Sequence, residues 1–242
     1  MAKKPATAIR IGLWALPLYG ALTAWASIDP QPDSSTDPEG WARFVSTDSY
    51  LVSHLVGSTG GTILAILGTM ALGGYLVGGR SARLGVAGMV IAVAGHAVLL
   101  VPATISTFAT PAIGRAYLAG FTDVMQITFS GAADAMLLLG LLLALVGNIL
   151  LGVAMWRSGL LPVWVGVVWV ISAVVFYVLG VVLGLVTTGA SLPTQPVGAL
   201  LIVVSGAWTA WVAQHPRPDP SPTGGSADRD RPVPDARTDA AP

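Results

Sequence analysis

The 242-residue sequence contains no cysteine and few charged residues. The absence of cysteine excludes disulfides, thiolate nucleophiles, and zinc or iron–sulfur sites built on cysteine ligands. Charged residues make up 10% of the chain, and 12 basic residues balance 12 acidic ones, so no basic surface indicates nucleic-acid binding. Hydrophobic residues, in contrast, make up 54%. This composition is typical of a protein that folds in a lipid bilayer and not in water.

The apolar residues form stretches near the length that crosses a membrane. A bilayer core of about 30 Å requires roughly 20 apolar residues in a helix. We therefore predict an all-α, six-helix transmembrane domain over residues 1–213. The remaining segment, 214–242, is rich in Pro, Asp, Arg, Gly, Ser and Thr, which predicts a disordered cytoplasmic tail. The predicted spans are 9–28, 50–77, 84–107, 133–156, 160–187 and 193–213.

The basic residues gather on one set of connections between the spans. Lys and Arg are concentrated on the cytoplasmic side of membrane proteins, so this distribution places both termini in the cytoplasm. The Ala, Gly and Val content suits a bacterium, which makes the bacterial plasma membrane the expected location. The connections on the other side carry Arg43 and Arg115, whereas the cytoplasmic set is Lys3, Lys4, Arg10, Arg80, Arg83, Arg157 and Arg217.

The first apolar stretch has two interpretations. Lys3-Lys4, an apolar run and Ala24-Trp25-Ala26 resemble the three regions of a cleaved signal peptide. The run is, however, longer than most signal-peptide cores, and Trp25 suits a helix anchored at the membrane interface. We expect the stretch to be retained as the first span.

Two segments outside the predicted spans carry helix-start signals. Asp37-Pro38-Glu39 combines an N-cap residue with a proline at the first helical position, which predicts a short helix. Thr110-Pro111 predicts a second, separate helix after Pro102 has kinked or ended the third span. The face of that second helix is apolar, so it forms either a lid on the outer interface or a plain connector. Its apolar face is Ile113, Tyr117, Leu118 and Phe121.

Small residues recur at every fourth position of the second span. In lipid, helices associate where small side chains let their backbones approach closely. We therefore expect this ridge to be the central packing face. The Gly60-Gly61 pair within it also raises the possibility of a broken helix at a ligand site. The ridge consists of Ser53, Gly57, Gly61, Ala65, Thr69 and Gly73.

One ionisable residue, His96, is predicted at mid-membrane depth, and ionisable groups there are functional candidates because burying them is costly. Asn148 is predicted at a similar depth and is a potential hydrogen-bond partner of His96. We therefore predict a ligand site in the outer half of the bundle. The candidate ligand-binding residues are His96, Asn148, His54, Gly57 and Gly61.

The sequence lacks the motifs of known intramembrane chemistries, namely a zinc-binding H-E-x-x-H helix, a buried aspartate pair, a G-x-S-x-G elbow and a phosphate-binding glycine loop. A haem held by His54 and His96 is an alternative. Helical rise, however, separates the two residues by roughly 16 Å along the membrane normal. A third hypothesis, an outer-surface metal site or interfacial enzyme, uses His54, Asp48 and Asp134.

Two short stretches carry a resemblance. The run Arg157-Ser158-Gly159-Leu160-Leu161-Pro162-Val163-Trp164 and the run Ser53-His54-Leu55-Val56-Gly57 resemble elements of uncharacterised six-span bacterial membrane proteins. The resemblance implies the architecture and no activity. We expect a membrane protein, with a non-enzymatic role favoured over an enzymatic one, that binds or passes a small-molecule or lipid ligand or serves as a partner subunit in the lipid bilayer. Its cofactor is unknown, and having none is a stronger expectation than haem.

Overall fold

The computed structural model describes residues 6–29, 31–127, 131–188 and 191–215, and every regular element in these ranges is a helix. The predicted tail at 214–242 lies outside the described residues except for its first two positions. The elements are α1 (Thr7–Gly12), α2 (Ala15–Ala26), α3 (Pro38–Val45), α4 (Asp48–Ser53), η1 (His54–Gly60), α5 (Gly61–Leu76), α6 (Ala82–Leu118), η2 (Thr122–Gln126), α7 (Gly131–Arg157), α8 (Val163–Ala173), η3 (Val174–Val182), α9 (Leu183–Thr188) and α10 (Thr194–Gln214).

Five helices in the described part of the chain are long and apolar enough to cross a membrane. Two of them are composite, because α4, η1 and α5 form one rod and α8, η3 and α9 form another. Four of the five agree with predicted spans to within three residues at each end. The five are Asp48–Leu76, Ala82–Leu118, Gly131–Arg157, Val163–Thr187 and Thr194–Gln214.

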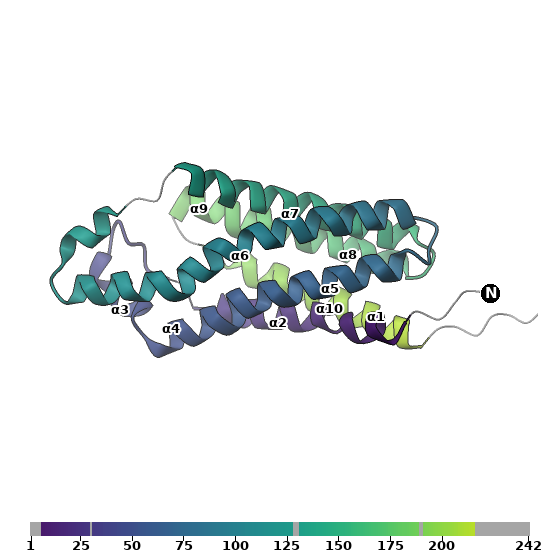
Figure 1. Cartoon of the computed structure of the whole chain (residues 1–242), viewed down its shortest axis with the longest axis horizontal. Helices are drawn as coiled ribbons and strands as arrows, with labels where there is room; N and C mark the ends of the chain where they lie inside the picture. The colour runs from purple at the N-terminus through teal and green to yellow at the C-terminus, as the bar shows by residue number, and fades with distance from the viewer. Residues whose placement is uncertain (1–5, 30, 128–130, 189–190, 216–242) are drawn as a thin grey trace, which may run out of the picture.

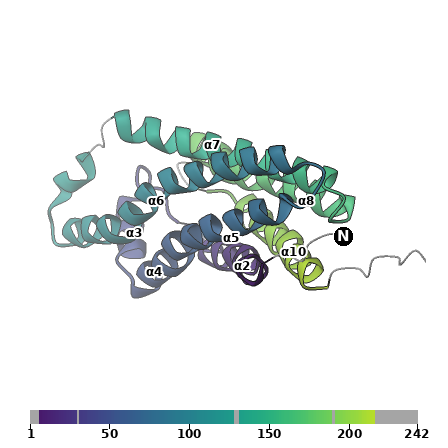
Figure 2. The same cartoon turned by 45° about the vertical axis from the view of Figure 1, so that its right-hand side comes forward.

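The first predicted span is divided into α1 and α2, and neither piece alone reaches spanning length. Pro17 explains the division, because proline has no N–H to donate to the carbonyl of Leu13 four residues earlier. The amide of Leu16 donates to that carbonyl instead, at 3.2 Å, which tightens the chain at this turn. Both pieces nevertheless lie in the bundle, where α2 packs between α5 and α10 (Figures 1 and 2).

The helix that contains the predicted third span continues past residue 107, where that span was expected to end. Helix α6 continues through Pro102 and Pro111 for 37 residues, which at 1.5 Å per residue is about 55 Å. Its far end is stabilised by α3, which approaches closely at Gly114. A Cβ at this glycine would lie 2.8 Å from the Ser46 hydroxyl and 2.9 Å from the Ala42 carbonyl. The separate helix predicted from Thr110 is therefore the last part of α6.

A small apolar cluster beyond the bundle joins α3, α4 and the end of α6, and we call this region the cap. Asp37 accepts a hydrogen bond from the Gly40 amide at 2.9 Å and Pro38 begins the helix, which confirms the predicted helix α3. The cap lies at one end of the molecule (Figure 1). Its core contains Trp41, Ala42, Val45 and Tyr50, with Phe44, Ile113, Tyr117 and Met125 packed around them.

The opposite end holds the first and last described helices, and we call it the terminal end. An Arg10 guanidinium nitrogen donates to the carbonyl of Gln214 at 3.3 Å, which places the start of α1 beside the end of α10. Two interhelical turns also meet there, because the Arg80 amide donates to the Ser158 carbonyl at 3.0 Å. The cap and the terminal end therefore lie at opposite ends of the bundle (Figure 1).

The closest helix pair is α6 with α7, and we call their contact the seam. A Cβ at Gly147 would overlap the backbone of Ala92, and one at Gly95 would overlap that of Ala144. The ridge predicted as the central packing face is divided between two neighbours. Gly57 faces α2, whereas Gly73 faces Met89 of α6. Small residues thus determine the packing, as expected in lipid, but the tightest contact is between two other helices.

Candidate functional site

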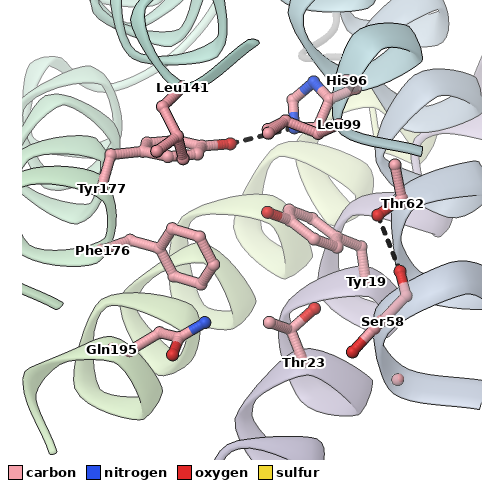
Figure 3. A pocket seen from close by; sticks show the side chains of 11 residues that line it. Tyr19, Thr23, Ser58, Thr62, His96, Leu99, Leu141, Phe176, Tyr177 and Gln195 are labelled. Carbon is pink, nitrogen blue, oxygen red and sulfur yellow. Dashed lines mark hydrogen bonds between the residues drawn. The ribbon is translucent and has the colours of Figure 1, made fainter. Parts of the chain in front are cut away.

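A cavity of about 140 Å³ lies among all six helical rods, and we call it the inner cavity. Figure 3 shows polar and aromatic side chains from different helices converging on it. Its volume suffices for several waters or one small ring, since an apolar cavity of roughly 150 Å³ binds benzene. The lining residues are Tyr19, Thr23, Gly57, Ser58, Thr62, His96, Leu99, Leu141, Phe176, Tyr177 and Gln195.

Two π-helical segments face each other across this cavity. Segment η1 contributes Gly57 and Ser58, and η3 contributes Phe176 and Tyr177. A π-helix is rare and frequently occurs at functional sites because it rearranges the backbone hydrogen bonds of a helix. Near η3, the carbonyl of Gly180 accepts from the Leu192 amide at 2.9 Å. The irregular segment is thereby held against the start of α10.

Both ring nitrogens of His96 have hydrogen-bond partners. Nδ1 lies 2.7 Å from the Ala92 carbonyl, which can only accept, so Nδ1 carries a proton. Nε2 lies 3.0 Å from the hydroxyl of Tyr177. The side chain is only 3% exposed, and no carboxylate lines the cavity to balance an imidazolium. A neutral ring with Tyr177 donating to Nε2 satisfies all of these groups.

Aromatic rings form one wall of the inner cavity. Tyr19 and Tyr177 each meet the His96 ring in an edge arrangement, with ring centroids 6.0 Å and 6.5 Å away. Phe176 in turn packs edge-on against Tyr177, with centroids 4.9 Å apart. The Tyr19 hydroxyl points toward the interior of the cavity (Figure 3). The wall is thus apolar where the ring faces line it and polar at the tyrosine hydroxyls.

A second cavity of about 480 Å³, the outer cavity, continues from the inner one toward the cap. Thr23, Ser58 and Gln195 line both cavities and therefore mark the passage between them. This volume lies in the range of roughly 300–1,000 Å³ that is typical of small-molecule sites. Its other lining residues are Trp25, Ala26, Ser27, Asp29, Gln31, Phe44, Thr47, Ser49, Tyr50, Ser53, His54 and Ser191.

Gln195 has a buried polar atom without a partner at the passage. Among the described residues, nothing hydrogen-bonds its Oε1, although that atom is buried. The stem of the side chain is fixed because its Cα and Cβ pack against Gly180 of η3, where a Cβ would meet them at 2.6–2.7 Å. Buried polar groups in proteins are nearly always paired. An unpaired amide oxygen beside a cavity therefore marks a place where a ligand or water completes the pairing.

The structure brings some of the predicted site residues together and separates others. His96 and Gly57 line the inner cavity, and His54 lines the outer one. Gly61 packs against Thr23 of α2 and lines neither. Asn148 lies on the far side of the seam, where its amide donates to Ala144 at 2.8 Å and accepts from the Trp169 indole at 3.2 Å. The proposed His96–Asn148 hydrogen bond is therefore not formed.

Sequence reasoning missed Tyr19, Phe176, Tyr177 and Gln195. A usable signal existed for the tyrosines, because a phenol in the middle of an apolar span must find a hydrogen-bond partner. No such signal marked Gln195, which the sequence places close to the edge of a predicted span. Its role depends on the position of α10 relative to η3.

The described residues contain no group of three or more His, Cys, Asp or Glu side chains that could hold a metal ion. His54, Asp48 and Asp134 are thus not assembled as the metal hypothesis requires. His54 instead stacks on Tyr50, with ring centroids 3.8 Å apart, and its Nδ1 bonds the Tyr50 carbonyl at 3.0 Å. The outer cavity is therefore lined by a ring pair and by hydroxyls.

Asp33 and Glu39, at the same end of the molecule as the cap, each have a local partner and line neither cavity. The amide and hydroxyl of Ser35 both donate to Asp33, at 2.8 and 2.7 Å, which lowers the pKa of that carboxyl. Glu39 forms an ion pair with Arg43 and raises the pKa of the guanidinium. Asp29 alone brings a carboxylate to the outer cavity, and the lining includes neither Lys nor Arg.

The fold and the site define a class: an all-helical bundle with five helices in its described part long and apolar enough to cross a membrane, and with a cavity lined by residues from several of its helices. Comparison with family models, with curated proteins and with solved structures finds no match to this chain. The assignment of function therefore rests on the geometry of the two cavities.

Proposed function

We propose that this protein is a six-span membrane protein of a bacterial plasma membrane that binds a small ligand in the inner cavity. Helices α1 and α2 together cover residues 7–26, a length of about 30 Å at 1.5 Å per residue. In this proposal they form the first span, with a bend at Pro17. The ligand enters from the outer face through the outer cavity.

Charge supports the orientation. Arg80 lies in the turn that meets Ser158 at the terminal end, and Arg10 contacts the end of α10 there. The cap carries the acidic residues Asp37, Glu39 and Asp48 and lies at the opposite end (Figure 1). Because Lys and Arg are retained on the cytoplasmic side, this distribution favours a cytoplasmic terminal end and an outer cap.

The observation that carries the proposal is the pair of joined cavities, with polar tips and two π-helical segments, inside an apolar bundle. Polar groups are costly inside a membrane protein and persist where they serve a pathway or a site. A purely structural role would leave them paired in tight packing, as Asn148 is. In the inner cavity, open volume and the unpaired Gln195 oxygen accompany them instead.

Binding is favoured over catalysis and over haem ligation. His96 uses one nitrogen for Ala92 and the other for Tyr177, so a substrate proton or an iron atom would have to displace Tyr177 to reach Nε2. An inner cavity of about 140 Å³ also has no room for a tetrapyrrole. A haem protein would show a Soret band after purification, and we expect none. The appearance of a stoichiometric Soret band would favour the redox alternative.

The absence of native cysteine permits a direct test of the cavity. Thr62 lines only the inner cavity, whereas its neighbour Ile63 is 45% exposed on the outside of the bundle, where lipid would lie. Thiol reagents react with the thiolate, which requires water at the site. We therefore expect methyl methanethiosulfonate to modify Thr62→Cys readily and the matched control Ile63→Cys slowly, in protein reconstituted in lipid.

Access from the cap side is tested in the same background. A bulky maleimide attached at Ser53→Cys in the outer cavity should slow a second reagent at Thr62→Cys. The same adduct at Val77→Cys, an exposed position close to the terminal-end turn, should have no effect. Unreactive Thr62→Cys, or equal reactivity of the two neighbouring cysteines, would mean that the inner cavity is not a ligand site.

A further inference from the structure

The inner cavity contains no group that could balance a charged ligand. None of its lining residues is Asp, Glu, Lys or Arg, and the one imidazole has both nitrogens in hydrogen bonds. Moving an unpaired ion into such surroundings costs far more than hydrogen bonds to neutral groups return. The ligand group that occupies the inner cavity is therefore uncharged.

The aromatic lining and the volume of the inner cavity favour a flat ligand group. Edge-packed aromatic side chains on one side and Leu99 and Leu141 on another leave a space of about 140 Å³. Aromatic faces favour other rings in stacked or edge arrangements. A single six-membered ring fills a cavity of this size, whereas a bicyclic or sugar-sized group would extend into the passage.

The unpaired amide oxygen at the passage favours a ligand ring that carries a hydroxyl group. Gln195 Oε1 is a buried acceptor without a partner. In Figure 3 the amide nitrogen points toward the space between Phe176 and Thr23 and the oxygen points away from it, so a half-turn of the terminal amide, which exchanges the two atoms, directs the oxygen to that space. A hydroxyl both donates and accepts, so it can pair with the amide oxygen and with the Thr23 or Tyr19 hydroxyl. Benzene offers the same shape with no such group.

We propose that the inner cavity binds the uncharged ring of a phenol-type compound, with its hydroxyl on Gln195. This assignment rests on the proposed function and names its ligand class. Any larger or more polar remainder of the ligand occupies the outer cavity, which is lined with hydroxyls and amides. Gln195 is thus the residue that distinguishes a phenol from a plain aromatic ring.

The test measures protection of Thr62→Cys from methyl methanethiosulfonate by small probes. The probes are phenol, benzene, benzoate and tetramethylammonium, each at the same free concentration after correction for partition into lipid. One hydrogen bond contributes about 0.5–1.5 kcal/mol, which corresponds to roughly two- to tenfold in affinity. We expect phenol to protect about two- to tenfold better than benzene, and the two ions to give no protection.

Two variants separate the hydrogen bond from packing. Gln195→Met keeps a long unbranched side chain and removes the amide, so phenol should protect no better than benzene. Gln126→Met, in η2 and in the lining of neither cavity, should retain the full difference. Labelling of Ile63→Cys under the same probes reports any general effect on the bilayer.

The outcomes distinguish the two proposals. If Thr62→Cys does not react at all, the proposed function fails before ligand class is tested. If it reacts but benzoate or tetramethylammonium protects it, the site is real and the neutral phenol class is wrong. Equal protection by phenol and benzene, or a phenol preference that survives Gln195→Met, would likewise overturn the assignment.

Discussion

The seam between α6 and α7 and the inner cavity beside it each accommodate a buried polar side chain, but the surroundings of the two side chains differ. Each buries one polar side chain that bonds back to the carbonyl four residues earlier, Asn148 to Ala144 and His96 to Ala92. At the seam, glycines bring the two backbones into contact, and on the other face of α7 the indole of Trp169 from α8 completes the pairing of Asn148. At the cavity, Tyr177 completes the pairing of His96, and open volume lies beside it.

The difference shows that buried polarity in this bundle does not by itself mark a site. Asn148 and His96 are both almost fully buried, at 7% and 3% exposure. What separates them is the geometry of their neighbours: regular helices with glycines at the seam, and π-helical segments with aromatic residues at the cavity. The seam should therefore determine stability, and the cavity should determine binding.

The largest expected effect is at the seam. Gly147→Leu would force α6 and α7 apart, because even a Cβ at this position overlaps the Ala92 backbone. We expect a loss of about 3 kcal/mol in the free energy of unfolding, measured by titration with sodium dodecyl sulfate in mixed micelles. The control Gly131→Ala, whose added methyl group would meet nothing within 4 Å, should unfold like the wild type. A stable Gly147→Leu protein would contradict the assignment of the seam.

Removing the polar pair that joins α7 to α8 behind the seam should have a smaller effect. Asn148→Leu leaves the Trp169 indole without its acceptor, and neither residue lines a cavity. We expect about 1 kcal/mol of destabilisation, with labelling of Thr62→Cys unchanged. Trp169→Phe should cost a similar amount, and the double variant should cost less than the sum. If the two losses of stability simply add in the double variant, the hydrogen bond between Asn148 and Trp169 does not stabilise the protein.

The corresponding change at the cavity should be smaller again. Tyr177→Phe removes the donor to His96 Nε2, but water in the adjoining cavity can take its place. We expect a loss of about 0.5 kcal/mol, less than for Asn148→Leu, in the same unfolding titration. A loss as large as that of Asn148→Leu would mean that water does not reach His96.

The smallest effect on stability is expected at Gln195. Because Oε1 is buried without a partner, Gln195→Met removes a polar group that is not paired in the folded protein. We expect the free energy of unfolding to stay the same or to rise by about 0.5 kcal/mol. A clear loss of stability in the unliganded protein would show that the amide already has a structural partner.

Much of the fold could be predicted from hydropathy, because a bilayer requires helices of a minimum length and the chain supplies them. The predictions failed where tertiary contact overrides local signals. Pro102 suggested a kink or helix end and Pro111 the start of a separate helix, yet α6 is continuous through both and packs against α3 at Gly114. Pro17 was not recognised as a break within the first apolar stretch, although its missing N–H separates α1 from α2.

The site was predictable only in part. His96 was recognisable as the one ionisable residue at depth, whereas a broken helix at Gly60-Gly61 was considered but not favoured, and π-helical η1 passes there into α5 without a break. The second π-helical segment, η3, has no comparable signal in its Val-rich sequence. It depends on contacts from the start of α10, such as the Thr194 hydroxyl bond to the Leu179 carbonyl at 2.9 Å. Such contacts join segments that the sequence keeps apart.

Cysteines at the two buried polar positions compare the seam with the cavity in a single experiment. His96→Cys and Asn148→Cys each place a smaller side chain at a site that is almost fully buried in the wild type. We predict that methyl methanethiosulfonate modifies His96→Cys at least about tenfold faster than Asn148→Cys, because only the former lies beside a cavity that admits water. Equal rates at the two positions would contradict the distinction between a dry seam and an accessible cavity.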